Sequence, residues 1–237
     1  MLNVTIYNEF ISERRDECCR EIYPDGIHEA IASFLRSDEI SVRCFCLDTV
    51  NEITDAVVDE TDVMIWWGHL AHNAVPDEVA MRVRDAVLKG MGIVFLHSAH
   101  HSKPFRLLMG TSCNLTWRED GDSELIWVVN PGPPITQGID RYFKLPHVET
   151  YGEPFGIPNP DEVIFIGNYS GGEAFRTGCT FHRENGRIFY FQPGHETFPI
   201  FYDTNVQTVI RNAVQWVKPI YRSSTLACPH VKKPGEE

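Results

Sequence analysis

The stretch Asp62–Leu96, DVMIWWGHLAHNAVPDEVAMRVRDAVLKGMGIVFL, decides the fold class of this chain. The runs Asp62–Trp67 and Gly92–Leu96 show no polar–apolar alternation, which is typical of strands that are buried on both faces. Between them, Pro76–Lys89 predicts a helix, with a proline at its start, an acidic first turn and Gly90 as its stop. A strand, a helix and a second strand in this order predict two parallel strands joined by a right-handed crossover.

The same alternation extends toward the N-terminus. Val4–Tyr7 and Ser41–Leu47 are predicted strands, and the apolar spacing within Gly26–Leu35 predicts a helix between them. The polar residues that follow Tyr7 predict a loop that runs as far as Gly26. These elements indicate an α/β fold built on a mostly parallel sheet.

The pattern changes after the parallel strands. Short strands and Pro/Gly turns over residues 115–155 predict a β-rich insertion over the sheet edge. Later, Cys179–Arg183 and Arg187–Gln192 flank an Asn-Gly pair, which predicts a hairpin, and a helix is expected at Asn205–Trp216. We therefore expect one domain over residues 1–218 and a polar tail over residues 219–237 that packs loosely or against a partner.

Composition excludes several classes of function. The net charge of −12 disfavours nucleic acid and anionic membranes as partners, because both require clustered Lys and Arg. We find no apolar run of the ~20 residues needed for a membrane span, and the N-terminal residues lack the basic and apolar regions of a signal peptide. Seven cysteines without a C-x-x-C pair indicate reduced thiols and a cytoplasmic protein. A small-molecule ligand and a homo-oligomeric state are the partners that we expect.

Histidines follow the predicted strand ends. Because ligands bind beyond the carboxyl ends of parallel strands, imidazoles from segments that are distant in sequence are expected to converge there. Neutral imidazole is the commonest metal ligand, and zinc takes it readily. We expect a divalent metal, zinc, held by some of four histidines: His28, His69, His97 and His195. The alternative is a polar pocket for a sugar, in which imidazoles donate and accept hydrogen bonds.

Two carboxylates are candidates for acid–base chemistry. In His147–Glu153 the alternation places Glu149, Tyr151 and Glu153 on one side of an extended segment. Paired carboxylates divide acid and base roles when their environments separate their pKa values; surface glutamates beside a turn are the alternative.

Other polar and aromatic side chains near these segments are expected to contact a substrate. We assign this role to Trp67, His72, His100, Lys103, Arg118, Tyr151, Glu173, Arg176 and Glu196. Aromatic faces with convergent polar groups suit a carbohydrate, although aromatic rings also dominate protein cores. Neither of the glycine-rich nucleotide-binding motifs occurs, so no nucleotide cofactor is expected.

Six segments together resemble the ThuA-like trehalose-utilisation proteins. They are YPDGIH (23–28), WWGHLAH (66–72), LHSAHHSK (96–103), MGTSCNLTWRE (109–119), GGEAFRTGC (171–179) and PGHETFP (193–199). The resemblance spans about residues 2–217. It implies a flavodoxin-like three-layer αβα fold related to class I glutamine amidotransferases, and a role in sugar catabolism that involves disaccharides or their keto-sugar derivatives.

The chain departs from amidotransferases where their nucleophile stands. The corresponding turn, Leu96–His100, has neither the cysteine nor its flanking glycines, although His195 occupies the place of the catalytic histidine. Glutamine hydrolysis is therefore not expected. Within ThuA-like proteins the commonly shared positions match His97, Glu149 and His195, whereas those of His28, His69, His72 and His100 match closer relatives only.

Two functional hypotheses follow. The first is a metal-dependent enzyme that acts on a disaccharide or keto-sugar, with the metal as Lewis acid and Glu149 or Glu153 moving the proton. Glu149 is assigned to proton transfer in this hypothesis, and hydrolysis, elimination and isomerisation all fit. The second is a non-catalytic carbohydrate-binding or sensing protein on an amidotransferase-like scaffold.

Overall fold

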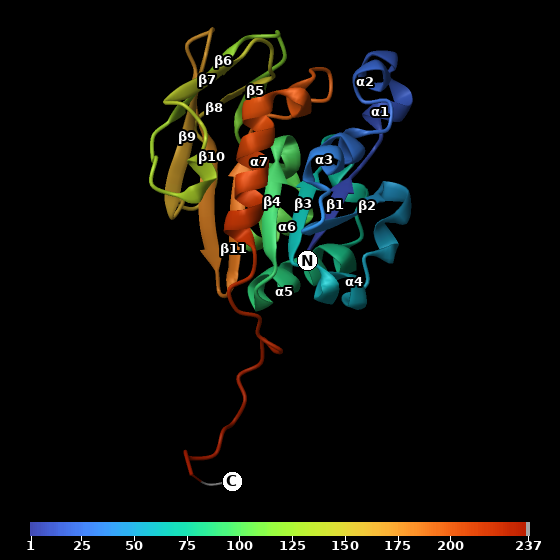
Figure 1. The fold of residues 1–237 in the computed structure, drawn as a ribbon, viewed down its shortest axis with the longest axis vertical. Coiled ribbons are helices and arrows are strands. Elements are labelled where there is room, and N and C mark those ends of the chain that lie inside the picture. The colour runs from blue at the N-terminus through green and yellow to red at the C-terminus, as the bar shows by residue number, and fades with distance from the viewer. Residues whose placement is uncertain (236–237) are drawn as a thin grey trace.

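The predicted parallel strands form one half of a large mixed sheet (Figure 1). The computed structural model describes residues 1–235, in which the strands form one nine-stranded sheet and one two-stranded sheet. The order in the large sheet is β2 (Ile40–Cys46), β1 (Leu2–Asn8), β3 (Val63–Trp67), β4 (Gly92–Leu96), β11 (Gly186–Phe191), β10 (Ala174–Arg183), β9 (Glu162–Tyr169), β6 (Glu124–Val128) and β7 (Tyr142–Leu145). Neighbours are parallel from β2 to β11 and antiparallel from β11 to β7.

Helices cover both faces of this sheet, so the predicted three-layer αβα architecture is confirmed. In Figure 1, α7 (Thr204–Val217) and α3 (Ile27–Leu35) lie in front of the sheet, and they contact each other. On the other face, α5 (Asp77–Lys89) packs against α4 (Asp55–Glu60) and α6 (Lys103–Met109). The apolar face predicted for the last helix is buried, at Val206, Val209, Ile210, Ala213, Val214 and Val217.

Residues 115–155 divide between two sheets. Strands β6 and β7 continue the central sheet as its outer strands, whereas β5 (Thr116–Arg118) pairs antiparallel with β8 (Thr150–Gly152) in a separate two-stranded ribbon. The hairpin predicted around the Asn-Gly pair joins β10 to β11. The insertion therefore enlarges the sheet and adds a ribbon beside it.

The polar segment predicted as a loop before Gly26 contains two short helices, α1 (Ser12–Arg15) and α2 (Glu17–Ile22). Tertiary hydrogen bonds hold this segment. The Ser12 hydroxyl donates to Glu196 at 2.8 Å, and Glu13 accepts from the backbone N–H of Ile27 at 3.0 Å. Hydrophobic periodicity does not predict helices of this kind, because distant partners stabilise them.

The C-terminal tail leaves the body of the molecule after a short contact. Arg222 donates to the Asp59 carbonyl at 2.9 Å and the Ser223 N–H donates to the Lys89 carbonyl at 2.8 Å, after which the chain extends away (Figure 1). All seven cysteines are free thiols. Within residues 1–235, the helices lack the length and apolar character of a membrane span.

The antiparallel half of the sheet buries a carboxyl group completely. Glu124 on β6 has no exposed surface, and it accepts a hydrogen bond from the Thr177 hydroxyl at 2.7 Å. Gly167 on the adjacent strand leaves space for it, since any Cβ there would collide with the carboxyl group. Burial raises the pKa of Glu124 to about 7, against the smaller opposing effects of Thr177 and Tyr169.

This burial predicts a pH-dependent stability. Unfolded Glu124 ionises with a pKa of about 4.3, whereas the folded state keeps its proton until about pH 7. The stability that the protonated Glu124 contributes is fully present below about pH 4, and about 4 kcal/mol of it is lost as the pH rises through 7. Urea unfolding at pH 4.5 and pH 8 should therefore show a steeper loss of stability for the wild type than for Glu124→Gln, whose amide still accepts from Thr177. Parallel stability curves for the two proteins would contradict the burial argument.

Candidate functional site

Three histidines meet at the carboxyl edge of the parallel strands. His69 follows β3, His97 follows β4, and His195 lies four residues after β11. These strands are parallel neighbours, so their carboxyl ends lie at one edge of the sheet. The imidazole centroids lie 5.1–5.7 Å apart. Glu149, which precedes β8, completes a cluster in which one ligand atom from each residue lies within 4.8 Å of the others.

Hydrogen bonds to Nδ1 fix two of these imidazoles. His97 Nδ1 lies 2.9 Å from the Gln192 carbonyl oxygen, and His69 Nδ1 lies 2.7 Å from Glu196. A carbonyl or carboxylate oxygen only accepts, so Nδ1 carries the proton and donates it. In the neutral form of either ring the lone pair is therefore on Nε2, which is the arrangement of a metal-ligating histidine.

The contacts of His195 do not fix which of its ring nitrogens carries the proton. Its Nδ1 lies 2.7 Å from the Thr197 hydroxyl, which can accept a proton, but the backbone N–H of Thr197 also donates to the same nitrogen at 3.3 Å. Burial, reinforced by His97, lowers the pKa of His195 to about 4, so the ring is neutral at physiological pH.

The cluster contains two buried polar atoms without a hydrogen-bond partner. His97 Nε2 and Glu149 Oε2 are 3.0 Å apart, both are inaccessible to solvent, and neither makes a hydrogen bond of acceptable geometry. Burial alone would raise the pKa of Glu149, but the interaction with His97, and then with the other two imidazoles, lowers it below its ordinary value. The Glu149 carboxylate is thus directed at Nε2 of His97, the ring nitrogen that the Gln192 carbonyl leaves free.

The backbone around His97 is strained. Its φ of +54° lies in the left-handed region, which costs a non-glycine residue on the order of 1–3 kcal/mol. The Tyr190 hydroxyl holds this conformation by donating to the His97 carbonyl at 3.0 Å. A strained residue at a strand-to-helix turn has the geometry of a nucleophile elbow, but the residue here is an imidazole with no hydroxyl or thiol.

Gly194 is required beside this turn. Its φ of +151° disfavours other residues, and a Cβ on it would lie 3.0 Å from the His97 Cβ. Trp67, which is fully buried, donates from Nε1 to the Gly194 carbonyl at 2.9 Å. The tryptophan predicted to contact substrate therefore positions the loop that carries His195.

A cavity of about 240 Å³ opens beside the cluster. His69 and Glu149 form part of its wall, and Tyr151, which stacks on His97 at 5.2 Å between centroids, forms another part. Trp117 lies in the wall with 67% of its surface exposed. The remaining lining residues are Leu115, Ser98, His72, His100 and His101. Burial lowers the pKa of His72 to about 3 and also lowers that of His100, so both rings are neutral.

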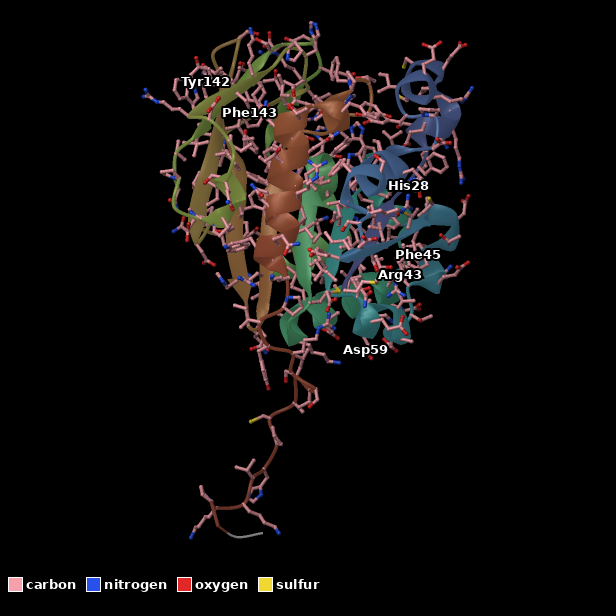
Figure 2. All side chains as sticks on the ribbon, in the orientation of Figure 1. His28, Arg43, Phe45, Asp59, Tyr142 and Phe143 are labelled. Atoms are coloured by element: carbon pink, nitrogen blue, oxygen red, sulfur yellow. The ribbon has the colours of Figure 1, made fainter. Side chains whose placement is uncertain are left out.

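The structure does not bring His28, one of the four expected ligands, into the cluster. His28 lies in the first turn of α3 (Figure 2), where its Nδ1 is 3.0 Å from Asn8 Nδ2 and its Nε2 is 3.8 Å from Cys46 Sγ. The group of potential ligands within residues 1–235 contains Glu149 in its place. The path of α3 turns the ring toward β1 and β2.

Glu153 and Arg176, which were expected to act on substrate, bind each other. Arg176 donates from Nε and Nη2 to the two oxygens of Glu153 at 2.7 and 2.9 Å. This bidentate pair joins the segment after β8 to β10, and Glu153 is absent from both the cluster and the cavity wall.

The other expected cations are also paired with carboxylates. Arg118 binds Glu173, with one contact at 3.0 Å, and also binds Asp120 and Asp122. Lys103 donates to Asp77 at 2.6 Å. Of the expected substrate contacts, the cavity wall contains His72, His100 and Tyr151, while Glu196 orients His69 from behind.

Three residues of the site were missed by sequence reasoning. Gln192 acts through its backbone carbonyl, for which a side-chain pattern carries no signal. Thr197 stands two residues after His195, and that proximity was the available clue. Glu119, with 46% of its side chain exposed, lies with Oε1 3.7 Å from His195 Nε2, and it reaches the site only because β5 pairs with β8.

Comparisons with known proteins agree with this architecture. A ThuA-like protein from Bacteroides uniformis is similar in structure, with a TM-score of 0.68 at 18% identity over 91% of this chain and 90% of that one. A cytoplasmic protein from Salmonella typhimurium gives a TM-score of 0.63 at 11% identity, covering 92% of this chain and 100% of that one. A glutamine amidotransferase from Thermotoga maritima gives 0.53 at 9% identity, over 90% and 96%.

These structural likenesses show the fold. No significant match was found among curated proteins. The family model ThuA, described as trehalose utilisation, matches residues 11–217. This match covers most of the chain, including the three histidines and Glu149, and the chain therefore belongs to the ThuA trehalose-utilisation family.

Proposed function

We propose that this protein is a metal-dependent enzyme of carbohydrate catabolism, in which His69, His97, His195 and Glu149 hold a divalent cation, Zn²⁺. The observation that carries the proposal is the pair of buried, unpartnered atoms His97 Nε2 and Glu149 Oε2, 3.0 Å apart beside two further imidazoles. Leaving such atoms buried without a partner costs about 1–3 kcal/mol each, and a cation satisfies both.

The donor set fits a cation of this kind. Zinc binds imidazole nitrogen and carboxylate oxygen at about 2.0–2.2 Å. Two such ligands at angles of 90–109° lie about 3.0–3.5 Å apart by the same bond lengths. The contact between His97 and Glu149 has this spacing. Glu149 therefore joins the proposed ligands, and this assignment replaces its expected role in proton transfer.

A bound cation would act as a Lewis acid toward a sugar carbonyl or hydroxyl group. The protein's own groups do the remaining work. Glu196 and the Gln192 carbonyl hold the rings of His69 and His97 in place. Tyr151, which is 2% exposed, shields the far face of His97 from water. Proton transfer falls to Glu119, which lies near His195 and has the exposure to exchange protons with solvent.

The substrate class is supported by the family and by the cavity. The family model's description refers to trehalose utilisation. The cavity wall combines aromatic faces with neutral imidazoles, which suit a ring with apolar C–H faces and hydroxyl edges. Hydrolysis, elimination and isomerisation all use a polarised carbonyl or hydroxyl. A cytoplasmic location is consistent with the seven free thiols.

Metal content tests the proposal directly. Protein purified without an affinity tag should contain about one zinc per chain by elemental analysis. Chelation should lower its melting temperature, because a ligand bound only by the native state stabilises that state. His69→Ala and Glu149→Gln should lose the metal. Chelation should then no longer lower the melting temperature of these variants.

Two control variants sharpen this test. His182, which is exposed and paired with Asp161, lies outside the cluster, so His182→Gln should keep full metal content. His28→Gln should keep it as well. Metal-free wild-type protein whose melting temperature does not respond to Zn²⁺ or Mn²⁺ would overturn the proposal and favour a non-catalytic sugar-binding protein.

Glu196 should tune metal affinity without binding the metal. Its pKa is lowered to about 2, because the contact with His69 outweighs the effect of burial, so it is an ionised acceptor for His69 Nδ1. Replacing such an orienting carboxylate typically costs 10–100-fold in metal affinity. Competitive chelator titration should show this loss for Glu196→Gln. Ser12→Ala, which removes a different hydrogen bond to Glu196, should cost less; equal losses would show that the effect is structural.

Glutaminase activity should be absent. The turn after β4 places His97 at the strained position, and Ser98 Oγ is engaged with the Gly68 carbonyl at 2.6 Å. An assay of ammonia release from glutamine should give the background rate for the wild type and for Ser98→Ala. Release that depends on Ser98 or on any cysteine would contradict this assignment of the turn.

A further inference from the structure

Gln192 directly follows β11 and contacts three segments around the candidate site. Its backbone N–H donates to the Thr177 carbonyl on β10 at 2.8 Å, and its backbone carbonyl accepts from His97 Nδ1 at 2.9 Å. Its side-chain Nε2 donates to the Glu149 carbonyl at 3.1 Å. One residue therefore contacts both His97 and Glu149, which come from segments that are distant in sequence.

These contacts join His97 and Glu149 at a second place. The first is the approach of Glu149 Oε2 to His97 Nε2 at 3.0 Å. The second is Gln192, whose carbonyl holds the other ring nitrogen of His97 and whose amide holds the main chain of Glu149. Because the same residue orients the imidazole and holds the main chain of the glutamate, it also sets the spacing between the two proposed ligand atoms.

The central sheet holds the backbone of Gln192 in turn. Its partner Thr177 is fully buried and donates its hydroxyl to the buried Glu124 at 2.7 Å. The bond between Gln192 and Thr177 continues the antiparallel pairing of β11 with β10, whose last pair is Gly178 and Phe191. The side chain that reaches Glu149 therefore starts from a fixed base.

The segment that carries Glu149 lies outside the central sheet, since β8 belongs to the two-stranded ribbon. Beyond β8, the Glu153–Arg176 pair joins this segment to β10. The Gln192 side chain joins it to the end of β11 at Glu149 itself. This contact is thus placed where a shift of the ribbon would move a proposed ligand.

Fold stability alone does not explain an amide at position 192. The Glu149 carbonyl oxygen only accepts, so the amide presents its N–H there and its oxygen points elsewhere. The side chain is 1% exposed, and Oε1 has no hydrogen-bond partner among residues 1–235. A buried polar atom without a partner costs free energy that an apolar side chain of similar length would not cost. A residue that costs stability in this way is typical of a functional site.

We propose that Gln192 is a positioning residue, whose side-chain amide holds Glu149 at the spacing from His97 that a single divalent cation requires. The proposal rests on the proposed function, because it concerns the same four ligands. It assigns the Gln192 side chain to metal affinity and not to the stability of the fold.

Gln192→Met tests this role, because methionine is of similar length, has no side-chain N–H and leaves the backbone contacts to His97 and Thr177 in place. The affinity for Zn²⁺, measured by competitive chelator titration, should fall 10–100-fold, as is typical when the partner of a metal ligand is lost. The melting temperature of the metal-free protein should equal or exceed that of the metal-free wild type, because the unpartnered amide oxygen is removed. A merely structural role would lower both quantities.

Gln207→Met is the matched control. Gln207 on α7 also donates from its side chain to a backbone carbonyl, that of Phe201 at 3.0 Å, and it lies outside the group of potential ligands found in residues 1–235. This variant should keep the wild-type affinity for Zn²⁺. Gln192→Asn is the second variant, for the case that methionine prevents folding. Its amide is one methylene shorter and cannot keep the contact with Glu149, so its affinity should fall as well.

The outcomes separate this inference from the proposed function. Wild-type affinity for Zn²⁺ in both Gln192 variants would overturn the positioning role. A Gln192→Met variant whose affinity and metal-free melting temperature fall together would overturn it too, since the side chain would then serve the fold. Wild-type protein that takes up no metal would overturn the proposed function, because each of these comparisons starts from a wild type that binds Zn²⁺.

Discussion

The parallel pairing of β3, β4 and β11 is the constraint on which the site depends. Each strand is buried on both faces and ends at the same edge, so the next residues of three distant segments are forced together. The tight turn at His97 and the close approach of Gly194 then bring the three imidazoles near enough to one another to coordinate a single metal ion. A break in this pairing would separate all three histidines at once, which no change in a single loop would do.

The antiparallel half of the sheet positions the ribbon that carries the remaining side chains of the candidate site. Its extension through β9, β6 and β7 leaves the β5–β8 ribbon beside the histidines, and this ribbon supplies Tyr151 and Trp117, with Glu149 just before it. The fold resembles that of a glutamine amidotransferase, and the strained turn after β4 carries an imidazole. The strand ends of this fold here bring together three histidines and a glutamate that could hold a metal ion.

Ion pairing separates most of the candidate charged residues from the histidine cluster. Glu153, Arg176, Arg118 and Glu173 are attractive candidates in sequence because polar residues cluster around glycines and turns. In the structure they satisfy one another and join the ribbon to the sheet. Glu149 is different, since its Oε2 lies 3.0 Å from His97 Nε2 and neither atom has a hydrogen-bond partner. The candidate site is therefore indicated by the unpartnered Glu149 oxygen, and the more polar segments around Glu153 and Glu173 lie outside it.

The sequence by itself determined the α/β class, the parallel core, the hairpin at Asn185 and the convergence of His69, His97 and His195, because hydrophobic periodicity and strand ends are local signals. Only the tertiary structure decided that His28 turns toward Asn8, that Glu149 joins the histidines, and that Lys103, Arg118 and Arg176 are consumed in ion pairs. It also decided that residues 115–155 extend the sheet. These outcomes depend on which side chains meet across segments that are distant in sequence, and a local pattern cannot encode the identity of a partner that lies 20 or more residues away.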